Sequence, residues 1–441
     1  MVVVFPMNMR NNTPETVSIV TLGCSKNTVD SEVLARQIQA NNLAFTNDPS
    51  DADTVIINTC GFICEAKEES VRTILEAGEL KKQGTIKKLL VMGCLTERYR
   101  QELEATIPEV DAFFGTTDLD EILATLGINF KRELLGERSL STPSHFAYLK
   151  ISEGCDNPCS FCAIPLMRGQ HRSRPLEEII REAEFLARSG VREIIIIAQD
   201  TTYYGLDLYG ERRLARLLQA VADIDGIEWV RLLYAYPSQF PENVLHLMRE
   251  HPNIVPYLDI PLQHISDQVL KSMRRGISAK RTRDLVRQIR DEVPGIILRT
   301  TFIVGYPSEN DEAFQELIDF VQESRFERLG VFTYSQEEGT SAAVLGDPVP
   351  AEIKAERREE IMNLQQDISR QFNESLIGSK LPVLIDRKED GVFIGRTPYD
   401  APEVDNEVYL TVEKNKELSV GALVEARISD ATEYDLRGYV L

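Results

Sequence analysis

Six apolar, strand-like runs alternate with helical patterns between residues 147 and 334 of this 441-residue chain. The runs are AYLKI (147–151), REIIIIA (192–198), WVRLLYA (229–235), VPYLDI (255–260), ILRTTFIV (297–304) and RLGVFTY (328–334). Strands joined through helices run parallel, because each helix carries the chain back along the sheet. A full βα barrel needs eight such units, so six predict a partial barrel with its ligand site at the carboxyl ends of the strands.

Three cysteines follow the first of these strands in the run EGCDNPCSFC: Cys155, Cys159 and Cys162. An iron–sulfur cluster is normally held by four thiolates, so a three-cysteine loop leaves one iron open to a substrate or cofactor. A structural zinc site is the alternative, but zinc favours a closed tetrahedral set of ligands. Within thirty residues only His145 and His171 could add to the three thiols. The spacing therefore favours a reactive cluster.

A second set of three cysteines lies near the start of the chain. Cys24, Cys60 and Cys94 end the apolar runs VSIVTLGC, DTVIINTC and KLLVMGC, and helical patterns beginning near Asp30 and spanning residues 70–82 separate them. In an open α/β sheet the carboxyl ends of parallel strands form one edge, where ligands bind. Three ordinary buried cysteines are the alternative. The repeated placement instead predicts that the thiols converge and hold a second cluster with an open iron.

The chain is expected to form three domains. They are an N-terminal open parallel α/β sheet domain (1–140), the partial βα barrel (141–375) and a small antiparallel β-barrel (376–441). The stretch GERSLSTPSH reads as the first linker. Pro350 opens a long helical pattern that stops at Gly378, and five short strand patterns between turn residues follow it. Five short strands suggest the small barrel.

Composition bounds the partners and the compartment. Seven cysteines in a long chain are no disulfide framework, so a reducing cytoplasm is implied. The opening MVVVFPM is too short for a secretory signal, and no run reaches the roughly eighteen apolar residues of a membrane span. The net charge of −21 is expected to repel nucleic acid and attract basic proteins; the alternative is that the charge only keeps the protein in solution. Four acidic residues are expected to form an exposed loop that recruits such a partner: Asp400, Glu403, Asp405 and Glu407.

The cysteine motifs resemble those of known enzymes. EGCDNPCSFC resembles the signature of the radical S-adenosylmethionine (SAM) enzymes, and the order of the three domains resembles that of the methylthiotransferase family, whose last module is the TRAM domain. LGCSKNTVDSE, with Lys26 and Asn27 after the cysteine, resembles the RimO branch, whereas the tRNA-modifying MiaB branch typically carries Met-Asn there. NTCGFI, YLKISEGC, YLDIPLQH, TFIVGYP and EYDLRG also resemble the RimO branch.

The resemblance implies two [4Fe–4S] clusters and SAM as cofactors. Cys24, Cys60 and Cys94 would hold the auxiliary cluster, and Cys155, Cys159 and Cys162 the SAM cluster. The implied activity is methylthiolation of an aspartate β-carbon on small-subunit ribosomal protein twelve, with a flavodoxin or ferredoxin as electron donor. A tRNA methylthiotransferase of the MiaB type and a non-catalytic iron–sulfur carrier remain alternatives. The Lys26-Asn27 pair and the acidic terminal module favour a protein substrate, so nucleic acid is not expected as the substrate.

Four further residues are candidates for binding SAM. Phe161 resembles the family's aromatic residue beside the SAM adenine, while Gln199, Asp259 and Gly305 lie at strand ends, where barrel sites form. No catalytic residue beyond the clusters is expected. His264 is interpreted as a core histidine with satisfied hydrogen bonds.

Two residues depart from the family pattern. Ser308 stands in Pro307-Ser308-Glu309 where the family usually has Pro-Gly-Glu, so the backbone of that turn is expected to differ. Cys64 lies four residues after Cys60 and could serve as a spare ligand of the first cluster, but it is interpreted as a buried thiol without a ligand role.

Overall fold

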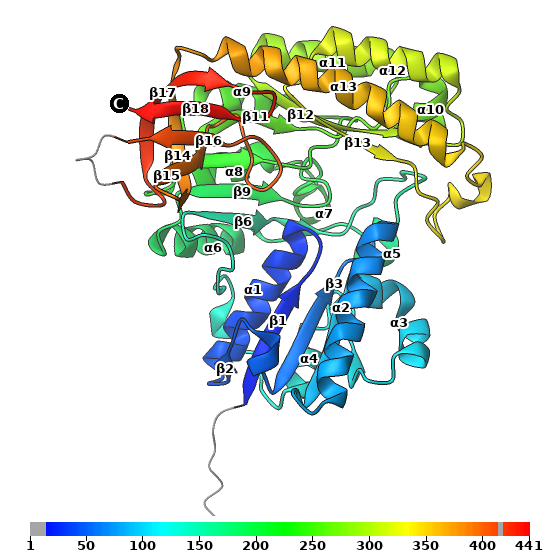
Figure 1. Ribbon diagram of the computed structural model, residues 1–441, viewed down its shortest axis with the longest axis vertical. Helices are drawn as coiled ribbons and strands as arrows, with labels where there is room; N and C mark the ends of the chain where they lie inside the picture. The colour runs from blue at the N-terminus through cyan, green and yellow to red at the C-terminus, as the bar shows by residue number, and fades with distance from the viewer. Residues whose placement is uncertain (1–14, 413–417) are drawn as a thin grey trace, which may run out of the picture. The chain divides into compact units, whose positions relative to one another are not determined.

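The structure is a computed structural model that describes residues 15–412 and 418–441. The chain forms two compact units, Met1–Ser139 and Leu140–Leu441 (Figure 1). Within the described residues, no helix is both long enough and apolar enough to cross a membrane.

The first unit is built on a five-stranded parallel sheet in the order β2-β1-β3-β4-β5. Its strands are β1 (Thr16–Thr21), β2 (Ala44–Phe45), β3 (Thr54–Thr59), β4 (Lys88–Gly93) and β5 (Ala112–Phe113). Alternate residues of β3 enter different apolar clusters: Val55 and Ile57 pack in one, and Ile56 packs in the other. Because successive side chains of a strand point to opposite faces, this sheet is covered on both sides, as predicted for an open α/β domain.

The helices of this unit begin earlier than the apolar periodicity suggests. They are α1 (Ser25–Ala40), α2 (Cys64–Lys82), α3 (Cys94–Thr106), α4 (Leu119–Thr125) and the 3-10 turns η1 (Pro49–Asp51) and η2 (Arg132–Leu134). The predicted starts near residues 30 and 70 were late, because the first turns of α1 and α2 carry polar residues and the apolar pattern begins further along. Cys24 is the residue before α1, and Cys94 is the first residue of α3.

The second unit contains the predicted partial barrel, a six-stranded parallel sheet in the order β13-β12-β11-β10-β9-β6. Its strands are β6 (Phe146–Lys150), β9 (Glu193–Ile197), β10 (Trp229–Leu232), β11 (Ile254–Asp259), β12 (Ile297–Val304) and β13 (Arg328–Thr333). Strands β6 and β13 form its two edges. A small antiparallel pair, β7 (Ser152–Glu153) and β8 (Arg172–Ser173), lies beside it.

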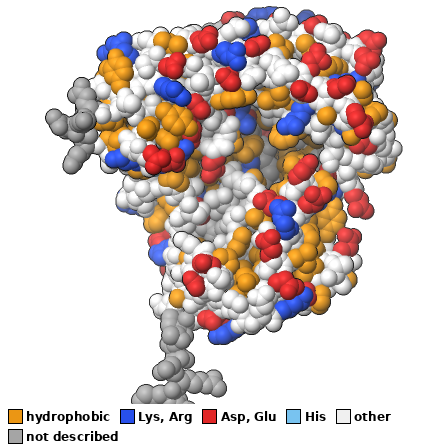
Figure 2. Space-filling model, viewed as in Figure 1, with side chains coloured by type: hydrophobic (Ala, Val, Ile, Leu, Met, Phe, Trp, Pro, Cys, Tyr) orange, Lys and Arg blue, Asp and Glu red, His pale blue; other side chains and the backbone are white. Residues whose placement is uncertain are grey.

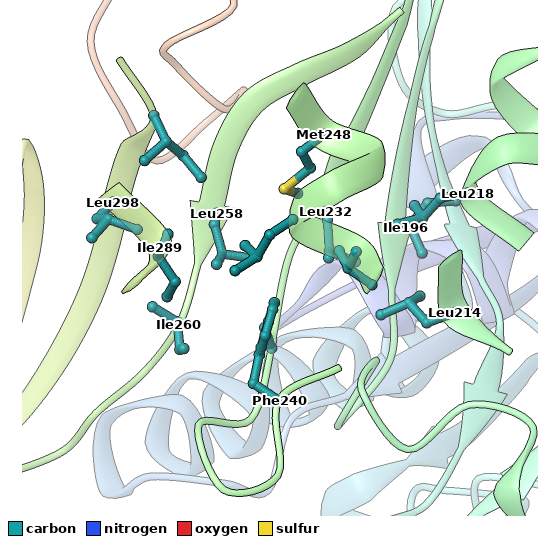
Figure 3. Packing of buried hydrophobic residues seen from close by; sticks show 14 of the residues in the cluster. Ile196, Leu214, Leu218, Leu232, Phe240, Met248, Leu258, Ile260, Ile289 and Leu298 are labelled. Atoms are coloured by element: carbon teal, nitrogen blue, oxygen red, sulfur yellow. The ribbon is translucent and has the colours of Figure 1, made fainter. Parts of the chain in front are cut away.

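Helices alternate with these strands and cover the outside of the sheet (Figure 1). They are α5 (Ile164–Arg168), α6 (Leu176–Arg188), α7 (Leu206–Tyr209), α8 (Leu214–Ala222), α9 (Glu242–Glu250), α10 (Asp267–Ser272), α11 (Ala279–Glu292), α12 (Asp311–Ser324) and the 3-10 turn η3 (Ala343–Leu345). Figure 3 shows Leu232 and Leu258 of the strands near Met248 of α9, all within one buried cluster. Burial of each such side chain contributes about 1.5–3 kcal/mol.

Helix α13 (Ala351–Ser375) follows Pro350 as predicted and buries Ile361 and Ile368 in the barrel core. After it comes a closed barrel in the order β14-β15-β16-β18-β17. Its strands are β14 (Lys380–Glu389), β15 (Val392–Arg396), β16 (Val408–Thr411), β17 (Leu423–Ala431) and β18 (Leu436–Val440). The barrel is not wholly antiparallel, because β16 and β18 pair in parallel. A closed ring with an odd number of strands cannot alternate direction all the way round.

The acidic loop, residues 397–407 between β15 and β16, is exposed only in part: Glu403 is exposed as predicted, whereas Asp400 is buried. Asp400 is 1% exposed, and it accepts hydrogen bonds from Arg328 Nε at 2.9 Å and Nη2 at 2.5 Å. Asp405 accepts a hydrogen bond from the Tyr257 hydroxyl at 2.6 Å and pairs with Arg299. The predicted exposure was wrong for Asp400 and Asp405, because the barrel strands carry arginine and tyrosine groups that need these carboxylates as partners.

The other two acids of the loop are also engaged. Glu403 accepts a hydrogen bond from the Tyr148 hydroxyl of β6 at 2.8 Å, and Glu407 pairs with Arg387 of β14. Arg231 of β10 donates to the backbone carbonyl of Pro398 at 2.8 Å. The acidic loop therefore packs against the strands of the partial barrel.

Candidate metal centres

The first cysteine set lies at the carboxyl edge of the N-terminal sheet. Gly23, directly before Cys24, has φ of +92°, and a Cβ built on it would lie 2.7 Å from Cys60 Cβ and 3.1 Å from Cys60 Sγ. Glycine is required here both by the backbone conformation and by the close approach of Cys60. The ends of β1 and β3 are thus brought into contact at their cysteines.

Asn27 connects the third thiol to the same edge. Its Nδ2 donates to the carbonyls of Leu22 at 2.8 Å and Thr59 at 3.0 Å, and Cys94 Sγ lies 3.9 Å from its Oδ1. Asn58 Nδ2 donates in turn to the Asn27 carbonyl at 3.0 Å. The structure therefore brings together the ends of three strands that are far apart in sequence.

Cys64 lies apart from this set of three cysteines, on the helix that follows β3. It is the first residue of α2 and is exposed, and its Sγ lies 3.7 Å from Glu68 Oε1, one turn along the same helix. The expectation that this thiol is buried was wrong. The prediction rested on the apolar character of cysteine, but Cys64 lies in the first turn of α2, which faces outward.

The second cysteine set lies in the loop between β7 and α5, and each sulfur accepts a hydrogen bond. The contacts are Asn157 Nδ2 to Cys155 Sγ at 3.5 Å, Arg275 Nη1 to Cys159 Sγ at 3.3 Å, and Ile164 N to Cys162 Sγ at 3.5 Å. Hydrogen bonds to the sulfurs are one means by which proteins tune iron–sulfur clusters. Asn157 also donates to Asp200 Oδ2 at 2.7 Å, which fixes its amide.

Ser160, within this loop, forms hydrogen bonds that fix the loop to neighbouring elements. Its N–H donates to Met273 O at 3.0 Å, its hydroxyl donates to Ser272 O at 2.9 Å, and its carbonyl accepts from Ala342 N at 2.7 Å. The Tyr306 hydroxyl lies 2.9 Å from Ser160 Oγ. The loop is therefore tied to the end of α10, to the turn after β12 and to the segment after β13.

The donor set fits a cluster. Burial raises the pKa of Cys155 to about 11 and that of Cys162 to about 12, so metal binding at neutral pH would release their protons. Across residues 15–412 and 418–441, no three His, Cys, Asp or Glu side chains are arranged to hold a single metal ion. A cluster is bound differently, with one thiolate on each of several irons, and two three-thiol sets suit that chemistry.

Gln199, at the end of β9, belongs to a buried network around Glu153. Gln199 Nε2 donates to Glu153 Oε1 at 2.6 Å, while Lys150 Nζ at 2.6 Å and Arg168 Nη1 at 3.2 Å contact Glu153 Oε2. Although burial favours the neutral acid, Lys150 and Arg168 hold the pKa of Glu153 at about 2. The sequence analysis missed Glu153, although it lies two residues before Cys155.

Asp259, at the end of β11, occupies a different network. Its Oδ2 accepts from Tyr234 N at 3.0 Å and its Oδ1 from Arg299 Nη1 at 3.2 Å. Phe161 is half-buried and packs against an apolar cluster that includes Met273 and Tyr306. The structure therefore places these candidates in separate surroundings within the barrel.

Gly305 begins the turn after β12, and Glu309 holds that turn. Gly305 has φ of +71°, its N–H donates to Glu309 Oε1 at 2.8 Å, and a Cβ built on it would overlap the stem of Lys354. Ser308 does not adopt a positive φ, so its backbone conformation does not require glycine.

The other carboxylate oxygen of Glu309 is the hydrogen-bond partner of His264. His264 Nε2 lies 3.0 Å from Glu309 Oε2, and Nδ1 accepts from Ser266 N at 3.1 Å, so His264 is the satisfied core histidine that the sequence suggested. Arg357 Nη1 of α13 also donates to Glu309 Oε1 at 2.6 Å.

A partial parallel βα barrel with a C-x-x-x-C-x-x-C loop at the carboxyl end of its first strand defines a radical SAM enzyme. Residues 149–321 match the radical SAM superfamily, residues 16–115 match the uncharacterized protein family UPF0004, and residues 377–441 match the TRAM domain. The chain belongs to the family of the ribosomal protein uS12 methylthiotransferases.

Curated relatives support that membership over nearly the whole chain. A ribosomal protein uS12 methylthiotransferase RimO from Chloroherpeton thalassium is 56% identical over 422 residues, which cover 95% of this chain and 97% of the relative. One from Flavobacterium johnsoniae is 53% identical and covers 96% and 97%. The radical SAM methyltransferase TsrM from Kitasatospora setae, at 15% identity, has a similar fold, with a TM-score of 0.53 and 72% of each chain covered.

Proposed function

We propose that this chain adds a methylthio group to the β-carbon of an aspartate of ribosomal protein uS12. The observation that carries the proposal is the near-full-length similarity to relatives named for that activity, in a chain with two three-cysteine sets at strand ends. A carboxylate beside the β-carbon opposes the formation of a carbanion, so a positioned base offers little help. When bound, the clusters and SAM supply the radical chemistry that such a C–H bond requires.

The cysteines are proposed as the cluster ligands, in two sets of three. Cys24, Cys60 and Cys94 would hold the auxiliary [4Fe–4S] cluster, and Cys155, Cys159 and Cys162 the cluster that binds SAM. The convergence of strand ends at Gly23 and Asn27 supports the first set. The hydrogen bond to each sulfur supports the second. The domains that carry them are proposed as 1–140 and 141–375, with the terminal module at 376–441.

Phe161, Gln199, Asp259 and Gly305 are proposed to contact SAM, with unequal support. Gln199 Oε1 is buried and has no hydrogen-bond partner among the described residues, so a ligand can satisfy it. Gly305 keeps the backbone after β12 free of a side chain. Each oxygen of Asp259 already accepts one hydrogen bond, so a contact with SAM would use a remaining lone pair of this carboxylate.

Three partner and location assignments extend the proposal. A flavodoxin or ferredoxin would deliver the electron, because the cluster has to be reduced before SAM is cleaved. A reducing cytoplasm is the expected compartment, since seven free thiols suit it. The tRNA alternative is not favoured. On the face that Figure 2 shows, acidic and basic side chains of the described residues are interspersed, without the continuous basic patch that nucleic acid requires.

Mass spectrometry of small-subunit proteins and tRNA from cells with and without the gene tests the function. The expected result is a methylthio group on one aspartate of uS12 that disappears with the gene and returns with the wild-type chain. A variant with Cys155, Cys159 and Cys162 all changed to Ala is the matched control and should not restore it. A methylthio group that depends on the gene and is found on tRNA and not on uS12 would overturn the proposal.

A further inference from the structure

Arg275 is a buried cation beside the second cysteine of the barrel loop. It is 4% exposed, and its Nη1 donates to Cys159 Sγ at 3.3 Å while its Nη2 donates to Pro261 O at 2.6 Å. Its guanidinium carbon lies 4.3 Å from the centroid of the Tyr236 ring. The Tyr236 hydroxyl lies 3.0 Å from Arg275 O and 3.5 Å from Cys159 Sγ. Arginine, tyrosine and thiol therefore form one compact group.

The position of Arg275 is fixed by the cysteine loop itself. Arg275 follows α10, whose last residues are tied to Ser160 through the hydrogen bonds to Ser272 O and Met273 O. Arg275 N also donates to Leu270 O at 3.0 Å. The backbone that carries Arg275 is thus bonded directly to the cysteine loop. This bonding holds the guanidinium close to the Cys159 sulfur.

The charge of Arg275 lacks the usual partner. Other buried arginines of this unit pair with carboxylates: Arg231 with Glu193 at 2.7 Å, Arg328 with Asp400 at 2.5 Å, and Arg357 with Glu309 at 2.6 Å. Within the described residues, no carboxylate is ion-paired with Arg275, and Asp200 acts on its charge only from beyond ion-pairing distance. Guanidinium stays protonated in proteins, and a buried charge without compensation is costly. A thiolate at Cys159, bound to a cluster, would supply the missing negative charge.

We propose that Arg275 raises the reduction potential of the cluster held by Cys155, Cys159 and Cys162. Reduction adds one electron, so a fixed positive charge near a ligand sulfur stabilises the reduced form more than the oxidised form. The electron comes from the external reductant, and Arg275 gains and loses no proton. Arg275 acts through Cys159 and is therefore a positioning residue. This inference rests on the proposed function, which assigns the cluster to these three cysteines.

The experiment uses the full-length chain in a background where Cys24, Cys60 and Cys94 are changed to Ala, so that only the barrel cluster is measured. After anaerobic reconstitution, iron content is determined and the cluster is titrated with dithionite under electron paramagnetic resonance. R275M removes the charge, and R275K keeps it without the planar fork. R212M is the matched control, because Arg212 also lies over a tyrosine and donates to a backbone carbonyl but contacts no sulfur.

R275M should weaken one-electron reduction about tenfold, which corresponds to a potential lower by about 59 mV. R275K should lie closer to the background protein, and R212M should match it. Equal potentials in R275M and the background protein, or an equal shift in R212M, would overturn the inference. If R275M does not retain iron, R275Q replaces it. Equal reduction potentials in R275K and R275Q would then also overturn the inference. A background protein that binds no cluster would instead contradict the proposed function.

Discussion

Gly305 shows how a single position sets the turn after β12. Its positive φ suits glycine, its N–H is held by Glu309, and the stem of Lys354 occupies the space that a side chain would need. Lys354 is itself anchored, because its Nζ donates to Tyr334 O at 2.9 Å and pairs with Asp347. The turn thus has two independent requirements for glycine.

Gly305→Ala should therefore cost more stability than the backbone strain alone. A non-glycine residue in the left-handed region costs about 1–2 kcal/mol, and the overlap with Lys354 adds to it. SAM affinity should fall in the same variant because the turn must shift. Thermal unfolding and calorimetric titration with SAM measure the two effects.

Gly210→Ala is the control for that comparison. Gly210 has φ of +73° in the left-handed region, and no atom lies within 4 Å of the position that a Cβ would take, so only the backbone strain applies. It should lose about 1–2 kcal/mol and keep its SAM affinity. Equal losses of stability and affinity in both variants would show that Lys354 moves aside freely.

Asp386 joins β14 of the small barrel to the start of β6. It lies 2.7 Å from His145 Nε2 and accepts hydrogen bonds from Arg396 at 2.8 and 2.9 Å. Although burial favours the neutral acid, His145 and Arg396 hold the pKa of Asp386 below its usual value. Its ionised form is therefore the one that the folded state prefers.

A lowered carboxyl pKa fixes the sign of the pH dependence. The stabilisation from Asp386 should be fully present above its unfolded pKa of about 3.9 and should be lost as the pH falls below that value toward the folded pKa. Denaturant unfolding between pH 3 and 6 measures the effect. Asp386→Asn should flatten this acid limb, while Asp430→Asn, at an exposed position of β17, should leave its slope unchanged.

At the scale of elements, the acidic loop is the clearest case of two modules completing each other. Asp400, Asp405 and the carbonyl of Pro398 satisfy Arg328, Arg299 and Arg231 on three strands of the partial barrel. These contacts replace water around charges that the barrel buries. The side chains of Asp400 and Asp405 are therefore part of the interior of the second unit, while Glu403 and Val404 of the same loop stay exposed.

Asp400→Ala should lower the free energy of unfolding by about 3–5 kcal/mol, because it leaves Arg328 buried without a partner. Replacing both residues with apolar ones, Asp400→Leu with Arg328→Met, should recover much of that loss. Denaturant unfolding of Asp400→Leu, of Arg328→Met and of the pair gives the coupling energy between the two residues. A loss below about 1 kcal/mol in Asp400→Ala would contradict the buried ion pair.

The sequence predicted the helices and strands better than it predicted which side chains contact one another. The strands that end at Cys24, Cys60 and Cys94, and the six barrel strands, follow apolar runs that local pattern reveals. The acidic loop looked exposed because Asp400 and Asp405 are charged, and their partners are separated from them by 72 and 106 residues along the chain. Arg275 gave no signal for the same reason, since Cys159 lies 116 residues away.

At the scale of the whole molecule, two cysteine sets predict two clusters. Anaerobically reconstituted protein should contain about eight irons, and changing Cys155, Cys159 and Cys162 to Ala should leave about four and abolish SAM cleavage. Iron and sulfide analysis with a SAM cleavage assay measures both. Cys64→Ser is the matched control and should keep the full iron content, since its thiol turns toward Glu68. Four irons in the unaltered chain would contradict two clusters.

The acidic loop also bears on how such enzymes can be recombined. A chimera that exchanged the chain after residue 375 for a foreign terminal barrel would remove the carboxylate that pairs with Arg328, one of the two carboxylates at Arg299 and the carbonyl that Arg231 contacts. Such a hybrid would need either the acidic loop of this chain grafted onto the foreign barrel or compensating changes in strands β10, β12 and β13. The partial barrel and the terminal barrel form one compact unit, so they are expected to be exchangeable only as a pair.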